Sequence, residues 1–100
     1  MTDPAGRWRL RRRSGLLPPL GFMRKRIAGD RGATLLGPLP LPFRVERRGE
    51  RVALRYRPPL VPLVDELHPD GPSAYRGRAR LGPIPLGRFD MWREGTPPPR

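Results

Sequence analysis

Short stretches in which apolar and polar side chains alternate recur along the chain. In residues 7–13, Trp8 and Leu10 would share one face of a strand, while the arginines at the odd positions would occupy the other face. The 16 prolines are spread over the whole chain and leave no window long enough for an ordinary helix. A period of two between frequent breaks predicts short β-strands.

The clearest hairpin lies in the middle of the chain. Phe43 and Val45 alternate on one arm and Val52, Leu54 and Tyr56 on the other, with a glycine in the turn that can take a positive φ. Similar alternation predicts further strands at residues 22–28, 33–36, 60–67, 74–81 and 88–93. The strand at 60–67 contains a proline, which donates no amide hydrogen bond, so we expect it to lie at a sheet edge or to begin after that proline.

Together these elements predict an all-β fold. We expect a small antiparallel meander of about six to eight short strands, curled into a barrel or a sandwich. Residues 1–94 should form this single domain, and the proline-rich residues 95–100 should form a disordered tail. Gly77 and Ala79 place small side chains on an inward face, which suits a sharply coiled strand or a backbone packed close to a ligand.

Composition restricts the chemistry that this chain can perform. It contains no cysteine, which excludes disulfides and thiolate metal sites, and His68 is its only histidine. Asp65 and Glu66 are adjacent and would point to opposite faces of a strand, so they cannot act as a paired acid and base. We expect these two acids to protect an edge strand and to pair with nearby arginines. The sequence favours a non-enzymatic protein with no metal and no cofactor.

The chain is strongly basic, with a formal net charge of +12 from 21 basic and 9 acidic residues. Lys25 is the only lysine, and such replacement of lysine by arginine is typical of a GC-rich bacterial genome. Two stripes of exposed arginines are predicted on the strands at 7–13 and 74–81: Arg9, Arg11 and Arg13, and Arg76, Arg78 and Arg80. These stripes could bind nucleic acid or an anionic membrane by electrostatics, although the aromatic residues needed for base stacking mostly lie on the opposite faces.

Two short features at the ends of the domain resemble a known superfamily. Gly6 and Trp8 form a G-x-W sequence at the start of the first strand, and the last strand ends in Trp92-Arg93. This combination resembles the calycins, which include the lipocalins and their short bacterial relatives. The resemblance implies that Gly6 and Trp8 close the floor of a barrel and that Arg93, or Arg88, packs across the tryptophan. It also implies a cup for a small apolar ligand.

The leading functional hypothesis is therefore the binding of a small apolar or amphipathic, lipid-like ligand inside the barrel. The predicted lining consists of Trp8, Phe43, Leu54, Tyr56, Tyr75 and Met91. The alternative is the basic module described above, acting through its arginine stripes.

An apolar loop follows the first strand and carries Leu16, Leu17, Leu20 and Phe22. It could fold over the open barrel end as a lid, or insert into lipid as a wedge between its basic flanks. Prolines and the basic block at residues 24–26 interrupt its apolar run, so no signal peptide is predicted and we expect a cytoplasmic protein.

Overall fold

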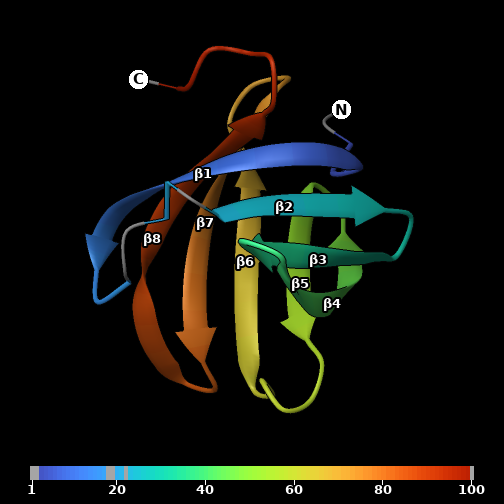
Figure 1. Cartoon of the computed structure of the whole chain (residues 1–100). Helices are drawn as coiled ribbons and strands as arrows, with labels where there is room; N and C mark the ends of the chain where they lie inside the picture. The colour runs from blue at the N-terminus through green and yellow to red at the C-terminus, as the bar shows by residue number, and fades with distance from the viewer. Residues whose placement is uncertain (1–2, 18–19, 22, 100) are drawn as a thin grey trace.

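The chain folds into a closed β-barrel in the computed structural model, which describes residues 3–17, 20–21 and 23–99 (Figure 1). Its eight strands are β1 (Gly6–Gly15), β2 (Met23–Ala28), β3 (Arg31–Leu36), β4 (Leu39–Arg48), β5 (Arg51–Tyr56), β6 (Leu63–Pro69), β7 (Ala74–Leu81) and β8 (Ile84–Arg93). Each strand pairs antiparallel with its neighbours in sequence, and β1 also pairs with β8. The prediction of a small all-β meander is confirmed, and it takes the form of a barrel.

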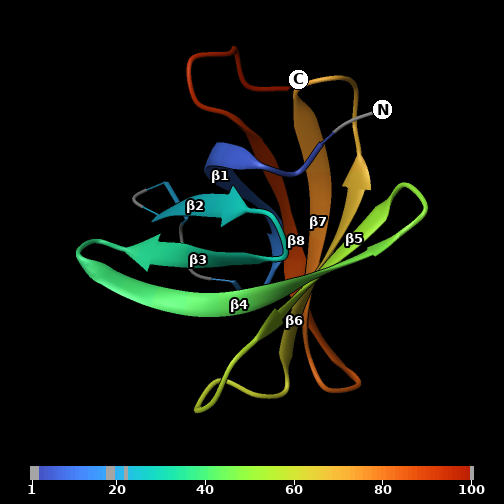
Figure 2. The ribbon, with the colours of Figure 1, turned by 90° about the vertical axis from the view of Figure 1, so that its right-hand side faces the viewer.

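The two ends of the barrel differ in what they carry. Because the strands run alternately up and down, the β1–β2, β3–β4, β5–β6 and β7–β8 connections lie at one end. The other connections and both termini lie at the opposite end (Figures 1 and 2). We call the first the open end, because the cavity described below is reached from it, and the second the closed end.

Large side chains fill the lumen toward the closed end. Trp8, Tyr75, Leu67 and Met91 have no exposed surface there. The rings of Trp8 and Tyr75 meet edge to face, with their centroids 5.4 Å apart. This packing forms the hydrophobic core.

Two strand glycines make room for aromatic rings of the core. A Cβ atom on Gly77 would lie 2.2 Å from the ring of Phe89, and one on Gly32 would lie 2.6 Å from the ring of Phe43. In both cases the glycine lies opposite that phenylalanine on the neighbouring strand. Gly77 therefore lies under Phe89, which explains the small residue at this position.

The boundaries of two strands can be compared with expectation. β6 begins at Leu63, just after the proline, which is the second of the two expected alternatives; it pairs with both β5 and β7, so it is not an edge strand. β4 is longer than predicted and includes Pro40 and Pro42. Pairing with β5 starts only at Phe43, so residues 39–42 have a strand partner on one side alone, where a missing amide donor is tolerated.

The tail that follows β8 makes contacts with the barrel. The Thr96 hydroxyl donates to the Arg93 carbonyl at 2.7 Å, and Arg11 Nη2 donates to the Pro99 carbonyl at 2.6 Å. In the part of the chain that the structure describes, no helix has the length and apolar character needed to cross a membrane.

Candidate functional site

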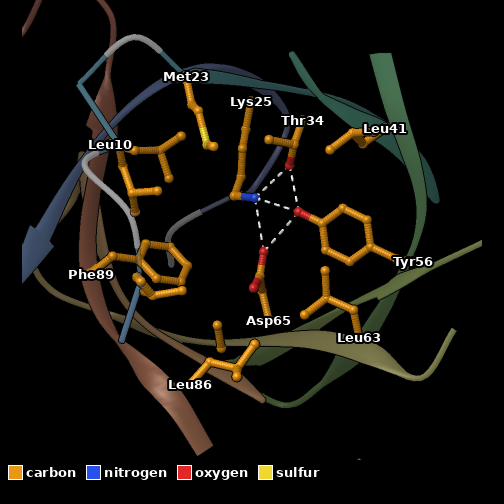
Figure 3. Close-up of a pocket in the computed structure, with 13 residues that line it drawn as sticks. Leu10, Met23, Lys25, Thr34, Leu41, Tyr56, Leu63, Asp65, Leu86 and Phe89 are labelled. Atoms are coloured by element: carbon orange, nitrogen blue, oxygen red, sulfur yellow. Dashed lines mark hydrogen bonds and ion pairs between the residues drawn. The ribbon is translucent and has the colours of Figure 1, made fainter. Parts of the chain in front are cut away.

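A cavity of about 240 Å³ occupies the lumen toward the open end (Figure 3). Apolar side chains form most of its wall, among them Leu10, Met23, Leu41, Leu63, Leu86 and Phe89. Its volume lies between the ~150 Å³ cavity that binds benzene and the ~300 Å³ at which typical ligand pockets begin. The space therefore suits a small ring compound or a short alkyl chain.

Four polar side chains meet in the wall of this cavity and form a buried cluster that we call the polar bridge. The Lys25 ammonium donates to Thr34 Oγ1 at 2.6 Å, to the Tyr56 hydroxyl at 2.8 Å and to Asp65 Oδ2 at 2.8 Å. Tyr56 donates to the same Asp65 oxygen at 3.0 Å, and its hydroxyl lies 2.5 Å from Thr34 Oγ1. All four residues are more than nine-tenths buried.

The barrel topology explains why these residues meet. Lys25 and Thr34 are direct register partners on β2 and β3. Asp65 lies on β6, four strands away from β2, and this is the opposite wall of a closed eight-stranded barrel. The long lysine side chain therefore spans the lumen and separates the packed core from the cavity.

The polar bridge holds a protonated lysine in an apolar interior. Burial by itself lowers the pKa of Lys25, but the Asp65 carboxylate and Tyr56 more than offset it, so the pKa of Lys25 is raised. The ammonium also lies 5.5 Å from the ring centroids of Phe43 and Tyr56. Burial raises the pKa of Tyr56, which keeps its proton available for Asp65. A lysine held in this state is a poor nucleophile and a poor base.

Most of the hydrogen-bonding groups of the polar bridge are already paired with one another. Lys25 has three N–H donors and all three are in use. Tyr56 gives its proton to Asp65, which leaves Thr34 to donate to Tyr56. The bonds that Asp65 accepts from described residues all end on Oδ2, and the dashed lines in Figure 3 reach only that oxygen. The remaining capacity of the cluster is therefore an acceptor, Asp65 Oδ1.

The predicted ligand lining needs correction. Of its six residues, only Tyr56 lines the cavity. The other five lie in the packed core and are at most 1% exposed: Trp8, Phe43, Leu54, Tyr75 and Met91. Their alternation correctly indicated an inward side chain, but it does not tell at which depth along the barrel axis that side chain lies.

The predicted lid residues have different positions. Leu17 and Leu20 line the cavity, and Leu20 is buried. Leu16 is 88% exposed and does not cover the opening. Phe22 lies outside the described residues.

The three residues expected to close the barrel are brought together at the closed end. The Arg93 guanidinium lies over the Trp8 ring, 4.5 Å from its centroid, and donates to the Ala5 carbonyl at 2.7 Å. Trp8 Nε1 donates to the Pro4 carbonyl at 2.9 Å. Gly6 has a φ of 127°, and a Cβ atom there would lie 2.7 Å from Arg93 Nη1. A side chain at this position would displace the arginine.

The six arginines expected to bind anions do not form one free surface. Four of them pair with acids: Arg11 and Arg13 with Asp90, Arg76 with Asp70, and Arg80 with Glu66. Arg13, Arg76 and Arg78 do line one outer hollow of about 620 Å³, together with Arg88 and His68. Arg9, Arg11 and Arg80 are not among its lining residues.

Sequence reasoning missed the polar bridge, although a signal for it was present. Lys25 is the only lysine among the 21 basic residues, and it has the same parity as the inward residues Met23 and Ile27. Asp65 likewise shares its parity with Leu63 and Leu67. The expectation that Asp65 pairs with arginines at an edge is therefore wrong, since it pairs with Lys25 across the lumen.

Among the described residues there is no group of three acidic or histidine side chains that could hold a metal ion. Comparisons of the chain with protein-family models, with curated proteins and with solved structures found no match.

Proposed function

We propose that this protein binds a small amphipathic molecule in the cavity at the open end of the barrel. The apolar part of the ligand would lie against leucine side chains such as Leu41, Leu63 and Leu86. Its polar group would face Asp65 at the polar bridge. The observation that carries the proposal is the cavity itself, which is apolar along its walls and polar at one point.

The chemistry of the polar bridge selects the polar group of the ligand. Asp65 Oδ1 accepts hydrogen bonds, whereas the donors of Lys25, Thr34 and Tyr56 are already engaged. A hydroxyl or an amide N–H would pair with this oxygen. A carboxylate would face the Asp65 charge without a donor, a costly arrangement in a buried site. The ligand class is therefore a small alcohol or amide with an apolar body, not a fatty acid.

The closed-end arrangement is in keeping with this function. The stacking of Arg93 over Trp8 ties the last strand to the first and to the N-terminal segment. The same arrangement is what a resemblance to the calycins implies, and it supports that resemblance as part of the proposal.

Binding of octanol and of octanoate, followed by NMR chemical shifts, tests the proposal. Octanol should shift the resonances of Ala79, Leu86 and other lining residues, and octanoate should bind roughly tenfold more weakly or worse. Leu86→Trp should fill the cavity and abolish binding, whereas Leu81→Trp adds the same side chain outside the cavity lining and should leave binding intact. The absence of any shift with octanol would refute the proposal.

One observation favours a second candidate function, the electrostatic binding of nucleic acid. The outer hollow brings Arg13, Arg78 and Arg88 together from three adjacent strands. Such a site would bind single-stranded oligonucleotides with an affinity that falls steeply with salt, and Arg78→Glu would weaken it. An affinity that is indifferent to salt would dismiss this candidate.

A further inference from the structure

Exposed apolar side chains are concentrated at one end of the barrel. Among the described residues, the large hydrophobic side chains that are exposed are Leu16, Leu39, Val61, Leu81 and Ile84. They lie in or beside four different connections, which the topology places together at the open end (Figures 1 and 2). We call these five residues the apolar rim. Single exposed hydrophobic residues are ordinary on any protein surface, but their gathering around one opening calls for a cause.

Acidic and basic residues are also distributed unequally between the open end and the closed end. The four segments that build the open end contain no acidic residue: 12–24, 35–44, 55–64 and 80–88. Arginines flank the apolar rim, among them the exposed Arg12, Arg57 and Arg88. The turns at the closed end carry acidic residues: Asp30, Glu50 and Asp70. The open end is therefore apolar at its tip, and the segments around it carry basic residues and no acidic one.

We propose that the open end of the barrel docks on an anionic lipid bilayer. The apolar rim would enter the boundary between headgroups and acyl chains, and the flanking arginines would contact anionic headgroups. Nucleic acid would explain the arginines, but it gives no role to a ring of leucine, isoleucine and valine side chains. A bilayer accounts for both features.

Docking in this orientation would place the cavity mouth against the membrane. Leu16 of the apolar rim directly precedes the lining residue Leu17, and its N–H donates to the carbonyl of the lining residue Leu86 at 2.7 Å. The apolar surface therefore continues from the outside into the lumen. An amphipathic molecule could then pass between bilayer and cavity without crossing water. The docking itself does not depend on ligand binding, because it rests on residues at the outside of the open end.

Site-specific labelling tests the docking directly, because the chain contains no cysteine. An environment-sensitive dye such as NBD is attached to Ile84→Cys in the apolar rim and, as a control, to Glu50→Cys in the β4–β5 turn at the closed end. Vesicles of phosphatidylcholine with phosphatidylglycerol are then added. The dye at position 84 should become brighter and shift to the blue, and the dye at position 50 should not respond. An equal response at both positions, or none at position 84, would overturn the proposal.

A pair of charge reversals separates docking by the open end from general basicity. Arg57→Glu at the open end should lower affinity for these vesicles roughly tenfold. Arg51→Glu at the closed end makes the same change of charge on another exposed arginine and should have little effect. Equal losses in the two variants would contradict docking by this end. Binding to single-stranded RNA without binding to vesicles would also contradict it.

Discussion

Removing the Lys25 ammonium should strongly destabilise the barrel. The Lys25→Met variant leaves Asp65 buried without its cation, and Asp65 is only 5% exposed. Breaking a buried ion pair by removal of one partner costs about 3–5 kcal/mol. Domains of this size have a total stability of about 5–15 kcal/mol, so the loss is a large share of the free energy of unfolding.

The effect is measured by urea denaturation, followed by the fluorescence of Trp8 and Trp92 and by circular dichroism. In a parallel thermal denaturation, a loss of about 3–5 kcal/mol at roughly 4–8 °C per kcal/mol for a chain of 100 residues predicts a fall in Tm of about 12–40 °C. If the variant keeps within about 1 kcal/mol of the wild type, the reasoning about the polar bridge is wrong.

If Lys25→Met alone does not fold, a double variant still tests whether the unpaired Asp65 charge causes the loss of stability. Lys25→Met with Asp65→Leu removes both charges, and Thr34 and Tyr56 can still bond to each other across 2.5 Å. Replacement of a whole buried pair by apolar residues is often neutral or stabilising. The double variant should therefore recover most of the lost stability. A double variant that is less stable than the single one would refute the explanation.

Other predictions concern pH, glycine contacts and the floor of the barrel. The pKa values of Lys25 and Tyr56 are both raised, so the stability that these groups contribute is complete below their ordinary values of 10.5 and 10.0 and is lost as the pH rises past them. Denaturation from pH 8 to pH 11 should show this fall, and it should be smaller in the double variant. Gly77→Ala should lower the free energy of unfolding by about 1–3 kcal/mol, because its methyl group meets the Phe89 ring. In a double-mutant cycle, Gly77→Ala should be less destabilising in a Phe89→Leu background than in the wild type. Gly6→Ala should cost about 1–3 kcal/mol by urea denaturation because of its positive φ and the approach of Arg93, and a neutral result would contradict the described stacking.

The strands could be predicted from the sequence because alternation is a local property. Trp8 and Leu10 face inward and Arg9 and Arg11 face outward, as their parity indicated. Closure of the barrel could not be predicted with the same ease. It depends on the pairing of β1 with β8, which joins residues about eighty positions apart, and a single sequence does not show which distant strands pair.

The candidate site was harder to predict because it depends on depth and on partners. Leu54 and Tyr56 point to the same face of one strand, yet Tyr56 lines the cavity and Leu54 lies in the core. The stagger of the strands decides between these two depths. The sequence pattern predicts no partner for Lys25 and predicts that Asp65 pairs with arginines at a sheet edge. Only the fold shows that the two face each other across one lumen.

A crystal structure of the protein grown with octanol tests the central claim most directly. We predict density for the alkyl chain between Leu41, Leu63 and Leu86, with the hydroxyl about 3 Å from Asp65 Oδ1. A cavity that holds only water, or an alcohol whose hydroxyl points toward the open end, would contradict the account.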